Sequence, residues 1–90
     1  MTERRNKIDI IYDILRVTND KGGKILPTHL LYKSNLSHQR MKGYVEELKQ
    51  KKLIDEVKED TKTFFVITDE GRKFLQQYHQ LKEFTEAFGL

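Results

Sequence analysis

Residues 27–71 read PTHLLYKSNLSHQRMKGYVEELKQKKLIDEVKEDTKTFFVITDEG, and this stretch combines signals for two short helices and a β-hairpin. Pro27 suits the first turn of a helix, where its missing N–H leaves no hydrogen bond unmade. We therefore expect a helix from Pro27 to Ser34, with Leu30 and Leu31 on its buried side.

A second helix is predicted from about His38 to Lys51. Ser37 is a good N-cap for it, and Asn35-Leu36-Ser37 forms the turn between the two helices, with Leu36 inserted between them. The apolar positions fall within a stripe of about 100° at helical spacing; they are Met41, Tyr44, Val45 and Leu48. The outward face then consists of Gln39, Lys42, Gly43, Glu46 and Gln50, flanked by His38 and Arg40.

A strand-turn-strand follows the second helix. A short strand begins at Leu53, and residues 63–68 are rich in the β-branched and aromatic side chains typical of strands. Residues 59–62 form the predicted hairpin tip. Thr68 is a good N-cap for a last helix from about Asp69 to Ala87, whose acidic first turn complements the helix dipole.

The chain begins with a predicted helix from Glu3 to Asn19 that is apolar on two sides. One side carries Ile8, Ile11, Tyr12 and Leu15, and the nearly opposite side carries Ile10, Ile14 and Val17. A helix of this kind needs two partners. We expect the second side to meet a late helix, either of this chain or of a second copy.

Two helices joined by a short turn and followed by a hairpin predict a winged helix-turn-helix: a mainly α fold with a small β-hairpin (α+β). Residues 1–72 form the winged domain, and residues 73–90 form a C-terminal helix continuous with it. This helix would be about 30 Å long in all. Its seam follows a 4-3-4-3 spacing, which is typical of a coiled-coil-like dimerisation helix; the seam is Phe74, Tyr78, Leu81, Thr85 and Phe88.

The seam has two interpretations. Phe74, Leu75 and Tyr78 would simply close the core of their own chain, as apolar stripes commonly do. Leu81, Phe84 and Phe88 lie beyond the point where a winged domain is complete, so they need cover from elsewhere. A homodimer would supply that cover. The predicted dimer interface is Ile10, Ile14, Val17, Phe74, Tyr78, Leu81, Phe84, Thr85 and Phe88.

Length and composition exclude several classes of function. Ninety residues build one core without a separate catalytic cleft, and the absence of cysteine excludes disulfides and thiolate metal sites. No apolar run approaches the roughly 18 residues that span a bilayer, and no cleavable signal precedes the first helix. We therefore expect a soluble, cytoplasmic, nucleoid-associated protein.

Catalysis is not predicted. His29, His38 and His79 are far apart in the sequence and lack metal-ligand spacing, so no metal, cofactor or small-molecule ligand is expected. Ser37 precedes His38 directly, but a nucleophile and its base also need a third, orienting group.

Positive charge is concentrated in the middle of the chain. The whole sequence has a net charge of +3, whereas Tyr32–Lys52 holds six cations against two carboxylates, a net +4, and Leu53–Lys62 is −2. A clustered basic face is the electrostatic footprint of phosphate contact. Lysine-rich helix surfaces also occur simply for solubility, so this signal leaves both interpretations open.

The sequence resembles the archaeal winged helix-turn-helix DNA-binding domain family, which includes small dimeric chromatin proteins of thermoacidophilic archaea. The matching stretches include Leu31–Ser37 and Ile67–Leu75, and the most specific parts of the resemblance are the turn around Tyr32 to Ser37 and the entry into the last helix from Thr68 to Gly71. Lys7-Ile8, Ile11–Leu15 and Tyr44–Leu48 also match. The resemblance implies a DNA-binding domain whose C-terminal helix pairs antiparallel with its copy.

Two features depart from the family pattern. Lys52 stands where a glycine often precedes the Leu-Ile strand, which bears on the geometry of that turn. The C-terminal helix is short for a long two-stranded rod, which favours a compact dimer.

Individual roles follow from side-chain chemistry. The amide of Gln39 can pair with both edge atoms of adenine, although Gln39 can also be a solvated helix residue. Gly43 either allows close approach to the DNA backbone or reflects tolerance of an imperfect helix. Phosphate contact is the role that suits Lys33, Arg40, Lys42 and Lys49. The candidate DNA-binding residues are Lys33, Ser37, His38, Gln39, Arg40, Lys42, Gly43, Lys49, Lys58, Thr61 and Lys62.

The acidic residues of this region limit the expected contact. Glu46 lies on the outward face of the second helix, so DNA contact should concentrate toward that helix's N-terminal half. Glu59 and Asp60 at the hairpin tip predict a minor contribution from the wing.

The function predicted from these features is that of a dimeric, double-stranded-DNA-binding transcription regulator. Two alternatives stay open: an architectural chromatin protein with little sequence preference, and a winged helix that contacts proteins instead of DNA. Salt separates the last from the others, because phosphate-driven binding weakens steeply with ionic strength.

Overall fold

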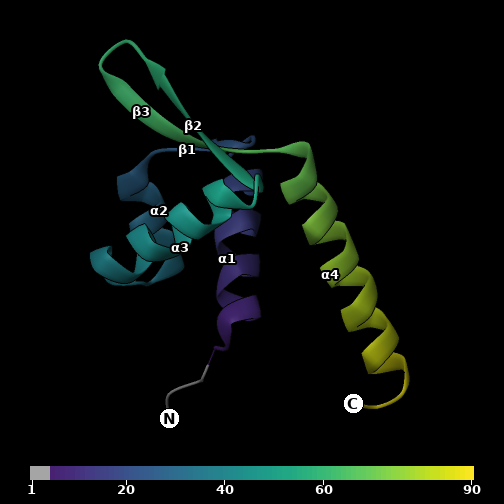
Figure 1. Ribbon diagram of the computed structural model, residues 1–90. Coiled ribbons are helices and arrows are strands. Elements are labelled where there is room, and N and C mark those ends of the chain that lie inside the picture. Colours follow the sequence, from purple (N-terminus) through teal and green to yellow (C-terminus); the bar gives the residue numbers. More distant parts are fainter. Residues whose placement is uncertain (1–4) are drawn as a thin grey trace.

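The computed structural model describes residues 5–90, which form a winged helix (Figure 1). The elements in chain order are α1 (Lys7–Asp20), β1 (Lys24–Ile25), α2 (Pro27–Ser34), α3 (His38–Gln50), β2 (Ile54–Glu59), β3 (Lys62–Ile67) and α4 (Asp69–Ala87). The three strands form an antiparallel sheet in the order β1-β3-β2, and the β2-β3 hairpin projects as the wing.

Helix α1 begins later than the sequence pattern predicts. The Asn6 side chain accepts a hydrogen bond from the Asp9 N–H at 2.8 Å, and the Asp9 carboxylate accepts one from the Asn6 N–H at 3.3 Å. This reciprocal capping box fixes the first helical residue as Lys7. The predicted start at Glu3 lies outside the described residues, and the extension of the helix through residues 5 and 6 was wrong.

Helix α1 lies at the centre of the molecule and contacts α2, α4, β1 and β3. Ile10, Ile14 and Val17 are therefore buried in the core of their own chain. Their predicted place in a dimer interface is corrected: the second apolar side of α1 is covered by other elements of the same fold.

Strand β1 has no counterpart in the sequence-based prediction. Its two residues pair with β3, Lys24 with Val66 and Ile25 with Phe65. Gly23, at φ +89°, precedes it and accepts a 2.9 Å hydrogen bond from the Ile67 N–H. A glycine adopts this left-handed conformation without the strain of a Cβ.

The helix-turn-helix itself is as predicted. Asn35 takes a left-handed conformation at φ +56° and ends α2, Leu36 is buried, and the Ser37 hydroxyl accepts a hydrogen bond from the Arg40 N–H. Helix α3 ends one residue earlier than expected. Lys52, which replaces the family's glycine, adopts φ +65°, so the backbone keeps the geometry that a glycine favours.

The hairpin is tighter than predicted. Strand pairing runs to Glu59 and Lys62, so only Asp60 and Thr61 form the turn, with Asp60 at φ +56°. Helix α4 has the predicted bounds. Its N-cap Thr68 accepts a hydrogen bond from the Gly71 N–H at 3.0 Å and donates one to the Lys52 carbonyl at 2.7 Å.

Aromatic stacking attaches α4 to α1. The Tyr12 and Tyr78 rings stack with centroids 4.2 Å apart, and the Tyr78 hydroxyl donates to the Asp9 carboxylate at 2.9 Å. The Tyr12 hydroxyl oxygen also lies 3.2 Å from His79 Nε2. Residues 80–90 make no hydrogen bond or ion pair to other elements of the described chain, and α4 diverges from α1 toward its C-terminus (Figure 1).

Candidate nucleic-acid interface

One face of α3 is buried and the opposite face is open to solvent. Met41, Val45 and Leu48 pack into the core. The exposed side chains include those predicted to face DNA: His38, Gln39, Arg40, Lys42 and Glu46. A Cβ placed on Gly43 would meet no atom within 4 Å, so the helix backbone is bare at the middle of this face.

A hollow of about 410 Å³ separates α3 from the sheet. Lys42 and Glu46 line its helix side, and Glu56 and Thr63 line its sheet side. Because paired residues of adjacent strands share a face, and Lys58 pairs with Thr63, Lys58 extends this same face along the wing. Lys62 pairs with Glu59 on the other face, so the two predicted wing lysines are separated.

Three carboxylates near α3 and the wing are compensated by lysines. Lys49 binds Glu56 at 2.8 Å, Lys24 binds Glu59 at 2.8 Å, and Lys7 binds Glu47 at 2.6 Å. The hydrogen bonds to Glu47 and to Glu56 raise the pKa values of Lys7 and Lys49 above the ordinary lysine value.

Exposed pairs of this kind add little stability. Their effect on the local charge is larger, since each cancels a carboxylate that would repel phosphate. Within residues 5–90, no carboxylate lies within 4.0 Å of Arg40, Lys42 or Lys58. These three side chains therefore give the α3 face and the wing uncompensated positive charge, as a phosphate-binding surface requires.

The other predicted DNA-binding residues are dispersed. Lys49 is held by Glu56 and Glu46, and the Ser37 hydroxyl is used as the cap of α3. Thr61 is exposed at the turn of the wing. Lys33 lines a separate hollow of about 320 Å³ with Arg16 of α1 and with Lys21, the residue that follows α1, so the structure does not bring Lys33 to the groove beside α3.

Two lysines were not predicted from the sequence: Lys7, which lies beside Gln39 and Arg40 of α3, and Lys24, which lies on the face of the wing that carries Glu59. Both are identifiable as cations, but their partners Glu47 and Glu59 are distant in the sequence, and only the tertiary fold brings them together. Lys24 also lies over the Phe64 ring, 4.7 Å from its centroid, which fixes it beside the wing.

Metal chemistry finds no support in the part of the chain that the structure describes. Residues 5–90 contain no cluster of three or more histidine, cysteine or acidic side chains able to hold an ion. Over the same range, no helix is both long and apolar enough to traverse a bilayer.

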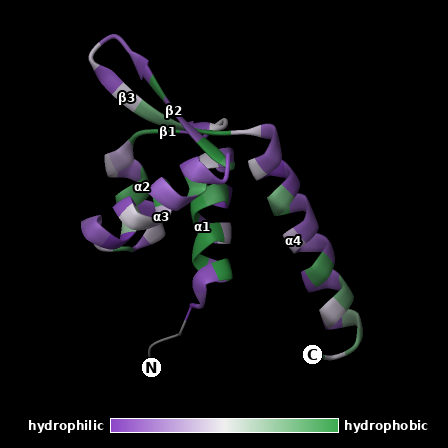
Figure 2. Cartoon of the chain, in the orientation of Figure 1, coloured by the Kyte–Doolittle hydropathy of each residue, from purple (hydrophilic) through white to green (hydrophobic). Residues whose placement is uncertain are grey.

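A second candidate surface lies on the C-terminal half of α4. Leu81, Phe84 and Phe88 are 64%, 64% and 67% exposed, and the two phenylalanine rings meet edge to face at 5.0 Å. Figure 2 shows apolar residues recurring along α4 to its end. Phe74 and Tyr78 instead pack against their own chain, so only the distal part of the predicted seam is open.

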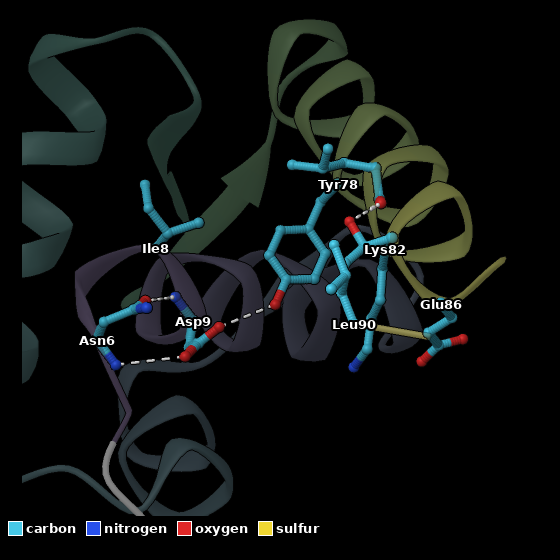
Figure 3. Close-up of a pocket in the computed structure, with 9 residues that line it drawn as sticks. Asn6, Ile8, Asp9, Tyr78, Lys82, Glu86 and Leu90 are labelled. Atoms are coloured by element: carbon cyan, nitrogen blue, oxygen red, sulfur yellow. Dashed lines mark hydrogen bonds between the residues drawn. The ribbon is translucent and has the colours of Figure 1, made fainter. Parts of the chain in front are cut away.

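A hollow of about 550 Å³ continues this surface between α4 and the start of α1 (Figure 3). Ile8, Leu81 and Leu90 give it an apolar lining, and the hydrogen-bonded pair Asp9–Tyr78 lies beside them. Thr85 also lines the hollow, and its hydroxyl donates to the Leu81 carbonyl at 2.7 Å.

The model of the winged helix-turn-helix family matches residues 4–86, so the chain belongs to that family. A comparison with curated protein sequences finds no match.

Among solved structures, one similar protein is Sso10a-2, a DNA-binding protein from Sulfolobus solfataricus. It is 19% identical, with 93% of this chain and 85% of Sso10a-2 covered and a TM-score of 0.77. A winged-helix DNA-binding protein from STIV is 17% identical over 89% and 92% of the two chains, also with a TM-score of 0.77.

Bordetella bronchiseptica BpsR, whose DNA binding is regulated by 6-hydroxynicotinic acid, is 18% identical with a TM-score of 0.74. The match covers 87% of this chain but only 58% of BpsR. At these identities, the likeness to all three proteins establishes the fold.

Proposed function

We propose that the protein binds double-stranded DNA as a homodimer and regulates transcription, with α3 in the major groove and no catalytic activity. The observation that supports DNA binding is the charge pattern of the exposed α3 face and of the wing. Arg40, Lys42 and Lys58 have no carboxylate partner among the described residues, while Glu47, Glu56 and Glu59 are each paired with a lysine. DNA-binding relatives of the same fold support the proposal.

The same observation bears on the alternative of a protein-contacting winged helix. That alternative rested on the acidic wing, on the mixed charge of α3 and on the apolar second side of α1, which is buried within its own chain. Pairing removes much of the negative charge from the wing and from α3, since Lys24 compensates Glu59 of the wing and Lys7 compensates Glu47 of α3. DNA is therefore the partner that the surface favours.

A salt series tests the proposal. The protein is titrated against a fluorescent duplex of mixed sequence at several ionic strengths, and the logarithm of the binding constant is plotted against the logarithm of salt concentration. Each phosphate contact contributes a slope of about −0.9. Replacing Lys42 with Gln should weaken binding and reduce the slope by about one contact.

Lys73→Gln is the matched control, because Lys73 is an exposed lysine of α4 whose charge is paired with Glu70 at 3.3 Å. It should leave both affinity and slope unchanged. Equal effects of the two substitutions would point to general electrostatics instead of a defined face. Absence of binding at low salt would reject DNA as the partner.

Gln39 is the proposed base reader. Gln39→Ala should lower affinity for a preferred site by a factor corresponding to about 1–3 kcal/mol, while binding to random duplex stays the same. Equal losses on both duplexes would instead favour the architectural chromatin role, in which the protein reads little sequence.

Dimerisation is proposed for the distal half of α4. Leu81, Phe84 and Phe88 are exposed on one side of α4, in the part of the helix that the core of the same chain does not cover. A second copy of the chain presents the same apolar side, so antiparallel pairing buries both. The hollow beside Ile8 extends the surface that such a pair would cover.

Sedimentation of a Leu81→Glu, Phe88→Glu double variant tests this part. We expect a folded monomer that binds DNA more weakly, because one half-site is lost. The control introduces the same charges at Gln76 and Gln80, which are exposed and lie off the apolar seam at helical spacing. An unchanged species in the seam variant would reject this interface.

A further inference from the structure

An arginine ahead of α1 contacts the turn of the helix-turn-helix. Arg5 Nη1 donates to the Ser34 carbonyl at 3.0 Å and to Asp13 Oδ2 at 2.9 Å, and Arg5 Nη2 donates to the Asn35 carbonyl at 3.4 Å. One guanidinium group thus joins the segment before α1, α1 itself and the end of α2.

The two carbonyls are those that a helix end leaves without partners. The last carbonyls of a helix have no intrahelical donor and carry the negative end of its dipole. Asn35 has already turned into the left-handed region, at φ +56°. A guanidinium can bridge two adjacent carbonyls because it is planar and offers several donors in a fixed geometry.

The inner side of this turn offers little polar support. Ser34 is buried, and its Oγ has no hydrogen-bond partner within the described residues. Arg5 therefore supplies the side-chain hydrogen bonds to the Ser34 and Asn35 carbonyls. Only three residues, 35–37, separate α2 from α3, so any movement of the end of α2 is transmitted to the first turn of α3.

We propose that Arg5 is a positioning residue for recognition: it fixes the α2–α3 turn, and with it the orientation of α3, instead of binding phosphate. This inference rests on the proposed DNA binding by α3. Arg5 is only 28% exposed, and Nη1 is already bound to a carboxylate and a carbonyl. A phosphate would have to displace the Asp13 carboxylate or the Ser34 carbonyl to bind Nη1.

Binding across a salt series separates positioning from direct contact. Arg5→Ala should weaken binding about tenfold, the scale of a lost hydrogen bond to a charged group, at a temperature where the variant is folded. The salt slope should not change. A phosphate-binding arginine would instead reduce the slope by about 0.9, and that result would overturn the inference.

Arg16→Ala is the matched control. Arg16 is another arginine that approaches Asp13, at 4.0 Å, but it has no hydrogen bond to the turn. Its removal changes the net charge equally and should leave affinity unchanged. Arg5→Lys keeps the charge without the planar geometry, so restoration of full affinity by lysine would overturn the positioning role.

Hydrogen exchange on the free protein tests the same contact without DNA. In Arg5→Ala, the amides of residues 36–41 should exchange about tenfold faster, while those of β3 stay unchanged. Uniform acceleration throughout the chain, or no change, would overturn the inference. If the unaltered protein bound no DNA, the proposed function would fail on its own, and exchange would still show whether Arg5 fixes the turn.

Discussion

Two glycines in helices should respond to alanine in opposite directions. At Gly71, a Cβ would overlap the Leu53 carbonyl oxygen and lie 2.7 Å from Ile67 Cγ1. The carbonyl cannot move freely, because it accepts the Thr68 N–H at 3.2 Å. At Gly43, a Cβ would meet nothing within 4 Å.

The magnitudes follow from packing and helix propensity. Overpacking in a tight site costs about 1–3 kcal/mol, and alanine recovers up to about 1 kcal/mol of helix propensity. We therefore expect Gly71→Ala to lower the free energy of unfolding by about 1–2 kcal/mol, which corresponds to a fall in Tm of roughly 4–16 °C. Gly43→Ala should raise it by about 1 kcal/mol, or roughly 4–8 °C in Tm.

Thermal and urea unfolding, monitored by circular dichroism at one protein concentration, measure both variants against the unaltered chain. Each glycine is the control for the other, since the substitution is the same. An unchanged or raised Tm for Gly71→Ala would refute the close approach of α4 to the start of β2. DNA binding by Gly43→Ala then decides between the two explanations of Gly43, because it weakens only if the bare backbone approaches DNA.

Three further predictions concern stability. The hydrogen bond from Tyr78 to the Asp9 carboxylate raises the pKa of Tyr78. Folding therefore favours the protonated phenol, and the free energy of unfolding should fall as pH rises above about 10. In urea melts Tyr78→Phe should flatten this fall, and an equal pH dependence in both proteins would contradict the prediction. Lys52→Gly should raise the free energy of unfolding by up to about 1 kcal/mol by relieving a left-handed lysine, and a decrease would show that no strain is stored there. Thr68→Ala should lower the free energy of unfolding by about 1 kcal/mol through loss of the cap of α4. Thr68→Ser keeps the hydroxyl oxygen and should retain most of the stability of the unaltered chain. Equal losses in the two variants would exclude the cap as the cause.

Much of the fold is predictable because its signals are local. Pro27, Ser37 and Thr68 mark helix starts, and each predicted start agrees with the structure. The start of α1 was wrong because the reciprocal pairing of Asn6 with Asp9 was not recognised as a cap.

Long-range features were not predictable in the same way. Strand β1 is two residues long and exists through its pairing with β3, so no periodicity marks it. The second apolar side of α1 is visible in the sequence, but periodicity does not indicate which element covers it. Four elements of the same chain surround α1, which explains why Ile14 was assigned to the wrong neighbour.

In the candidate site, too, local features were predictable from the sequence and tertiary contacts were not. The exposed face of α3 follows from helical spacing, and Gln39 and Lys42 lie where the sequence predicts. The pairing of Lys49 with Glu56 and the separate position of Lys33 depend on tertiary contacts. A count of charges along the chain therefore overestimates how many lysines are available to phosphate.

The divergence of α4 from α1 beyond His79 makes the end of this helix sensitive to protein concentration. An isolated helix shorter than about 12–15 residues is marginal in water, and residues 80–90 lack hydrogen bonds to other elements of the described chain. If a second copy covers them, their helicity follows mass action, whereas the core around α1 folds independently of concentration. Dilution would then melt the end of α4 before it affects the DNA-facing domain. The helicity of residues 80–90 would therefore rise and fall with the concentration of the protein.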